Sequence, residues 1–201
     1  MTLAIDDAFL PATLTCHLMT DEEFSGFCAE HPDLFFEMTS EGELIVMPPT
    51  HSDTGASNFE VAGELRNWAR KDGRGIGADS STGFVLPNGA RRSPDASWTL
   101  KTRINELGEA KRKSFWHLCP DFVIEVKSET DRLKHVRGKL QEYIEQGAQL
   151  GWLIDPQNKT VEIYRPNGEV SVLSNLEKLE GEGPVAGFTL DLKYVWDPLA
   201  D

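Results

Sequence analysis

The sequence is short of cysteine, of basic residues and of long apolar runs, and each shortage narrows the class of protein. Its 201 residues include only 3 cysteines, which are widely spaced in no zinc-binding pattern and are typical of reduced cytoplasmic thiols. No apolar run approaches the roughly 20 residues that span a bilayer. The first residues also lack the basic and apolar stretches of a secretory signal. We therefore expect a cytoplasmic protein with no membrane partner.

Positive charge is scarce overall but unevenly distributed. The chain has 20 Lys and Arg against 33 Asp and Glu, and this net charge of −13 by itself disfavours nucleic acid, because phosphates would be repelled. Between Arg91 and Lys139, however, 12 basic residues stand against 7 acidic ones, and the remainder holds 8 against 26. The basic segment also carries the candidate chemistry. The local excess of basic residues is, by itself, explained better by a solvated charged surface than by a nucleic-acid-binding site.

Hydrophobic periodicity predicts a mixed α/β fold in a single domain spanning residues 1–201, with its core at roughly 20–196 after an N-terminal extension of 1–19. Amphipathic helices are expected at 20–31, 57–70 and 131–146. The apolar strands 121–127 and 150–154 flank the last helix, which predicts a parallel pair joined by a right-handed crossover. Hairpins are expected over 34–47 and 160–173. Other strands are expected near 76–79, 82–86 and 94–100, with an edge segment at 185–196.

Candidate chemistry begins on strand 121–127, where Glu125 and Lys127 stand two residues apart and so project from one face. A carboxylate there can hold a divalent metal while the ammonium reaches water or phosphate. Of the two aspartates that follow proline, Asp121 is about 13 Å of strand from Glu125, too far to share an ion. Asp95 lies on another predicted strand that pairing can bring alongside. Oxygen-only ligands of this kind favour Mg²⁺ or Mn²⁺.

Several motifs together resemble a known family. Pro94-Asp95 and Glu125-Val126-Lys127 resemble the PD-(D/E)xK nuclease signature. The stretches around them, over roughly residues 20–196, resemble the Uma2 family (DUF820), as do three further motifs: Thr54-Gly55-x-x-Asn58-x-Glu60-x-x-x-Glu64-Leu65, Lys139-x-x-x-Tyr143-x-x-x-Gly147 and Trp152-Leu153-Ile154-Asp155-Pro156. The resemblance implies a restriction-endonuclease-like core with flanking helices and added antiparallel hairpins. It also implies a nuclease activity.

The resemblance assigns roles to individual residues. Asp95 and Glu125 would be metal ligands, with the Val126 carbonyl oxygen as a third. Lys127 occupies the position of the signature lysine, but a helix lysine replaces it in many related sequences, and Lys139 fits that role. We favour Lys127 slightly on its spacing, and both lysines remain candidates.

Further candidates surround this set. Glu60, from the first long helix, resembles the extra acid that some of these nucleases add, and Glu64 is its rival one turn later. Four basic residues could line a phosphate-binding groove: Arg92, Arg132, Lys134 and Arg137. For each of these four alone, ordinary solvated charge is the simpler interpretation.

The leading hypothesis is a Mg²⁺- or Mn²⁺-dependent endonuclease that cuts DNA rather than RNA. An alternative, supported by the acidity of the remainder, is a catalytically silent module that binds nucleic acid or protein on the same fold. Hydrolysis of another substrate has no positive support beyond two acids and a lysine. Cleavage of both DNA strands would favour a two-fold homodimer.

Overall fold

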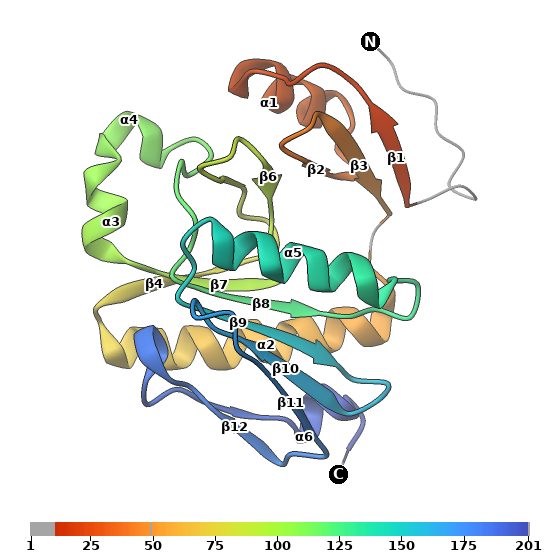
Figure 1. Ribbon diagram of the computed structural model, residues 1–201, viewed down its shortest axis with the longest axis vertical. Coiled ribbons are helices and arrows are strands. Elements are labelled where there is room, and N and C mark those ends of the chain that lie inside the picture. The colour runs from red at the N-terminus through yellow and green to blue at the C-terminus, as the bar shows by residue number, and fades with distance from the viewer. Residues whose placement is uncertain (1–10, 49, 201) are drawn as a thin grey trace.

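The fold is that of a computed structural model, which describes residues 11–48 and 50–200. The expectations for residues 1–10, the start of the N-terminal extension and the lack of a secretory signal, lie outside these ranges. A six-stranded mixed sheet in the order β11-β10-β9-β8-β7-β4 forms the centre. Its strands are β4 (Gly75–Asp79), β7 (Ala96–Leu100), β8 (Phe122–Val126), β9 (Leu150–Asp155), β10 (Thr160–Tyr164) and β11 (Val170–Ser174). Helices α2 (Ser52–Asp72) and α5 (Leu133–Glu145) cover its opposite faces (Figure 1).

The alternation of side chains along β8 explains the two helical layers. Phe122 and Ile124 pack into the apolar cluster that includes α2, whereas Val123 packs into the cluster that includes Leu140 of α5. Successive strand residues point to opposite faces of a sheet. Glu125 therefore points to the α5 side.

The predicted strand–helix–strand unit is present. Strands β8 and β9 pair in parallel, with Glu125 opposite Leu153, and α5 connects them. Strands β9, β10 and β11 then continue the sheet as antiparallel neighbours, and β7 and β4 extend it in the other direction. The mixed α/β fold with added hairpins is thus confirmed.

A second, five-stranded sheet lies above α5 in Figure 1. It consists of β1 (Ala12–Thr15), β2 (Phe35–Met38), β3 (Glu43–Met47), β5 (Phe84–Val85) and β6 (Arg91–Arg92), in the order β1-β3-β2-β6-β5. The helix predicted at 20–31 is α1 (Asp21–Glu30), which begins with a capping box between Thr20 and Glu23. Strand β6 stands a few residues before β7, so the chain passes directly from the small sheet into the large one.

The tail corrects one prediction. The prediction of an edge segment at 185–196 is wrong. Within this range β13 (Thr189–Asp191) pairs with β12 (Lys178–Glu180) in a two-stranded sheet that is separate from the large sheet. The 3₁₀ helix η2 (Gly183–Val185) lies between them and α6 (Lys193–Trp196) follows. Apolar tail residues join the cluster on the α2 face, and this burial packs the tail against that helix.

Two short helices, α3 (Lys101–Glu106) and α4 (Gly108–Arg112), follow β7. Within the described ranges, no helix has the length and apolar character needed to cross a membrane.

Candidate active site

Two acids from neighbouring strands meet at one end of the large sheet. Ala96 of β7 pairs with Ile124 of β8 in antiparallel register. One step further along that register sets Asp95 opposite Glu125, and directly opposed residues project from the same face. The Asp95 carboxylate contributes to raising the pKa of Glu125, which shows that the two acids interact. The register therefore brings the two acids to the same end of the sheet, and their sharing of one metal ion stays a prediction.

Two donors hold the Asp95 carboxylate in place. Its Oδ2 accepts a hydrogen bond from the backbone N–H of Val126 at 2.8 Å, and its Oδ1 accepts one from Nδ2 of Asn58 at 2.8 Å. Burial raises the pKa of Asp95 to about 6, although the Val126 hydrogen bond works against the shift. An ionised carboxylate has about four acceptor sites, so both oxygens can accept further partners.

Glu125 lies deeper than Asp95 and is held by α5. Its side chain is 8% exposed, and Nζ of Lys139 lies 2.9 Å from its Oε1. The Tyr143 hydroxyl donates to the same oxygen at 3.1 Å. Burial is the main cause that raises the pKa of Glu125. The nearby carboxylates of Asp95 and Glu37 add to the shift, and the Lys139 ammonium opposes it.

Lys139 bridges Glu125 to a third acid. Its Nζ lies 3.0 Å from Oε1 of Glu37, which reaches the site from β2 in the small sheet. Burial favours a lower pKa for Lys139, but the Glu125 and Glu37 carboxylates outweigh it and hold the pKa above the ordinary lysine value. The ammonium therefore stays charged at neutral pH.

The network continues from Glu37 to Arg92. Nη1 of Arg92 lies 3.2 Å from Oε2 of Glu37, and its Nε lies 2.7 Å from Oε2 of Glu142. The backbone N–H of Ser93 also donates to Glu37 at 3.1 Å. Glu37 is buried, which works to raise its pKa, yet the Lys139 and Arg92 charges reverse this and lower the pKa. Buried charges persist when each is paired in this way.

Lys127, the lysine favoured on spacing, lies elsewhere. Its ammonium donates to the Ser128 carbonyl oxygen at 3.0 Å and to a side-chain amide oxygen in the loop after β9 at 3.4 Å. Strand β8 ends one residue earlier, so its strict alternation no longer directs this long side chain. The geometry places Lys139, and not Lys127, on the Glu125 carboxylate.

No hydrogen bond or ion pair among the described residues joins the two acids predicted on α2 to this cluster. Glu60 is partly exposed and Glu64 is exposed. Neither forms an ion pair with another described residue. In their place α2 contributes Asn58, whose amide contacts Asp95.

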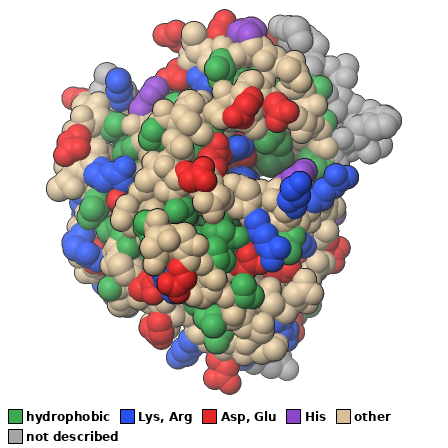
Figure 2. All heavy atoms as spheres, viewed as in Figure 1, with side chains coloured by type: hydrophobic (Ala, Val, Ile, Leu, Met, Phe, Trp, Pro, Cys, Tyr) green, Lys and Arg blue, Asp and Glu red, His purple; other side chains and the backbone are tan. Residues whose placement is uncertain are grey.

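The four predicted phosphate contacts divide into two groups. Arg92 has a side chain only 7% exposed and is committed to two carboxylates, so its placement contradicts that role. Arg137 is exposed but forms a bidentate pair with Glu162. Arg132 and Lys134 are exposed near the first turn of α5. Figure 2 shows a group of basic side chains level with that end of the helix.

Sequence reasoning missed three contributors to the site. Tyr143 and Asn58 each entered only as part of a family motif. Glu37 was not considered, although it interrupts an apolar strand in the same way as Glu125 does. A carboxylate inside an apolar strand was thus a usable signal for Glu37.

The donor atoms at this position fit a small divalent cation. In the described part of the chain, no three His, Cys, Asp or Glu side chains are grouped so as to hold a metal. The available donors are two carboxylates, the Val126 carbonyl and the Asn58 amide oxygen, which is buried without a hydrogen-bond partner among the described residues. Mg²⁺ typically takes one or two carboxylates and keeps several waters. Oxygen donors of this kind suit Mg²⁺ or Mn²⁺.

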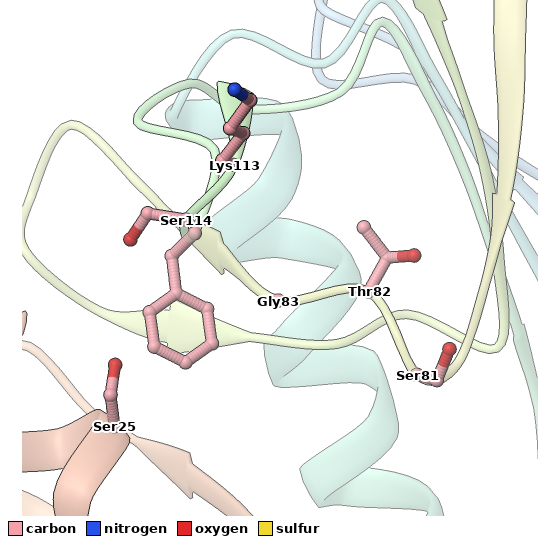
Figure 3. A pocket seen from close by; sticks show the side chains of 7 residues that line it. Ser25, Ser81, Thr82, Gly83, Lys113 and Ser114 are labelled. Carbon is pink, nitrogen blue, oxygen red and sulfur yellow. The ribbon is translucent and has the colours of Figure 1, made fainter. Parts of the chain in front are cut away.

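Two pockets are present in the described part of the molecule. One of about 420 Å³ is polar and is drawn in Figure 3, with Ser25, Ser81, Thr82, Gly83, Lys113, Ser114 and Phe115 as its lining. The other, of about 230 Å³, lies between α1 and β6. Asp95 and Glu125 line neither pocket. We therefore locate the candidate site by its paired acids, because the polar pocket is lined by no carboxylate.

Comparisons with known proteins agree with this architecture. The model of the Uma2 family, described as "Putative restriction endonuclease", matches residues 21–193. No curated protein matches the chain. One similar solved structure is described as a "putative nuclease belonging to DUF820" from Anabaena variabilis. It is 24% identical, covers 89% of this chain and 97% of its own, and superposes with a TM-score of 0.73, which shows a shared fold.

Proposed function

The chain belongs to the Uma2 family of nuclease-like proteins, and from this premise we propose that it is a Mg²⁺- or Mn²⁺-dependent endonuclease that hydrolyses phosphodiester bonds. One observation carries the proposal. Asp95 and Glu125 converge from neighbouring strands, and the Lys139 ammonium lies on Glu125. The preference for DNA over RNA is supported by the family's description as a restriction endonuclease.

Each residue in this cluster has a proposed task. Asp95, Glu125 and the Val126 carbonyl oxygen would hold the cation. When bound, such an ion polarises a phosphoryl oxygen and makes a bound water more acidic. Lys139 contributes a fixed positive charge that can stabilise the negative charge developing on the phosphate in the transition state. Because its side chain is only 20% exposed, this charge is screened less by solvent than a surface lysine would be.

Binding of the nucleic acid would rely on few exposed charges. Arg132 and Lys134 are the predicted phosphate contacts whose side chains remain exposed and unpaired among the described residues. The net charge of −13 makes attraction local to this end of α5, and with only two such contacts the dependence of affinity on salt should be shallow. Cleavage of both strands would call for a second site, and a two-fold homodimer stays a prediction.

The test is metal-dependent nicking of supercoiled DNA by the purified protein. With Mn²⁺, the wild type and Glu177→Gln, a matched change at an exposed site, should nick the plasmid, and a chelator should abolish nicking. Glu125→Gln should reduce the rate by about 100-fold or more. Duplex DNA, single-stranded DNA and RNA assayed in parallel would test the substrate preference. Equal nicking by wild type and Glu125→Gln would reject the site, and metal-independent DNA binding without cleavage would favour the non-catalytic module.

A further inference from the structure

An unsatisfied oxygen lies beside the proposed metal ligands. In the part of the chain that the structure describes, Oδ1 of Asn58 is buried and has no hydrogen-bond partner. Most buried polar atoms in folded proteins do have one, so an exception calls for an explanation. The other end of the same amide donates to Oδ1 of Asp95 at 2.8 Å.

The orientation of this amide follows from its partner. An ionised carboxylate only accepts hydrogen bonds, so the amide atom of Asn58 that contacts Asp95 must be the NH₂ group, and the other amide atom must be the oxygen. The buried oxygen is therefore a free acceptor on a group that is held against a proposed ligand. A hard cation is a suitable partner for it, because amide carbonyl oxygens are common ligands of such ions.

We propose that Oδ1 of Asn58 is a third side-chain ligand of the cation that Asp95 and Glu125 hold. This inference rests on the metal-dependent function proposed above. Among the described residues no three His, Cys, Asp or Glu side chains are grouped so as to hold a metal, and Asn58 adds a donor of another kind to the two carboxylates. With Asn58, the side-chain ligands carry two negative charges, which match one divalent ion.

Helix geometry separates Asn58 from the acid that the sequence nominated. Glu60 is two residues further along α2, and at 3.6 residues per turn its side chain is rotated by roughly 200° from that of Asn58. Val61, one turn from Asn58, is fully buried in the cluster on the α2 face. Asn58 is thus on the inward side of α2, and it fills the place expected for Glu60.

Terbium luminescence can count the ligands directly. The difference in Tb³⁺ lifetime between H₂O and D₂O reports the number of coordinated waters, and Mn²⁺ calorimetry reports affinity. Asn58→Ala should gain one coordinated water and bind Mn²⁺ about tenfold more weakly. Asn58→Asp should bind Mn²⁺ more tightly with no added water. Asn67→Ala, at an exposed asparagine of the same helix, should behave as wild type in both measurements.

The outcomes separate this inference from the function on which it rests. An unchanged water count in Asn58→Ala together with weaker Mn²⁺ binding would mean that Asn58 only positions Asp95, and would overturn the ligand assignment. If Asn58→Ala does not fold, weaker binding by Asn58→Asp would overturn it equally. If the wild type shows no Mn²⁺ or Tb³⁺ binding that Asp95→Asn abolishes, the proposed metal-dependent function itself fails.

Discussion

Replacing Lys139 by methionine tests how much the buried ion network contributes to stability. The change keeps the length of the side chain but removes the charge that joins Glu37 to Glu125. The side chains of Lys139, Glu37 and Glu125 are 20%, 2% and 8% exposed. Breaking a buried pair from one side typically costs about 3–5 kcal/mol. Glu37 keeps Arg92, and Glu125 can take up a proton because burial raises its pKa, so we expect a loss of about 3 kcal/mol.

Urea unfolding followed by tryptophan fluorescence would measure this loss. For a chain of this size, about 3 kcal/mol corresponds to a fall in Tm of roughly 6–12 °C. The double variant Lys139→Met/Glu125→Gln should recover part of the loss, because Glu125 is no longer left unpaired. Lys134→Met, at an exposed site on the same helix, should stay within about 0.5 kcal/mol of wild type. A loss below about 1 kcal/mol for Lys139→Met, or no recovery in the double variant, would refute this reasoning.

Three further results are expected. Mn²⁺ affinity, measured by calorimetry, should fall as the pH drops below about 8 and more steeply below about 6, because Glu125 has a pKa raised to about 8 and Asp95 one raised to about 6. Each carboxyl must lose its proton to bind metal, and constant affinity between pH 5 and 7 would contradict this. In the plasmid assay, Lys127→Met should nick at close to the wild-type rate, whereas Lys139→Met should reduce the nicking rate by about 100-fold. The reverse order would favour Lys127 as the catalytic lysine. In urea unfolding, Gly151→Ala should lower the free energy of unfolding by about 1–3 kcal/mol, because its Cβ would lie 2.7 Å from an α5 side chain. Gly138→Ala, whose Cβ would have nothing within 4 Å, should raise the free energy of unfolding by up to about 1 kcal/mol. The opposite ranking would contradict the packing of α5 on β9.

The central strand–helix–strand unit was the part of the fold most open to prediction. Its two strands are continuous apolar runs, and the helix between them has a regular apolar stripe, so local pattern and tertiary environment agree. The pairing of Asp95 with Glu125 was predictable for a related reason. Strand rise excluded Asp121, which instead accepts hydrogen bonds from Leu100 N–H and Arg103 at the start of β8.

Other features depend on contacts that no local pattern encodes. Strand β6 is two residues long, and its pairing with Met38 of β2 leaves no periodic signal. The choice between Lys127 and Lys139 turned on where two flexible side chains end, which sequence spacing does not specify. Glu37 lies 102 residues from Lys139, and their pair joins a strand of the small sheet to α5. Its strand shows an isolated charge, but its partner lies on a distant helix.

The span of the ion network has a kinetic consequence. Its contacts join residues 55 and 102 positions apart in the chain, at Glu37–Arg92 and Glu37–Lys139. Closing such long loops carries an entropic cost that local helices and hairpins do not face. During refolding, the β8–α5–β9 unit, whose three elements follow one another in the chain, should therefore form first. The nicking activity proposed above should return later, once the small sheet has docked and Glu37 has reached α5.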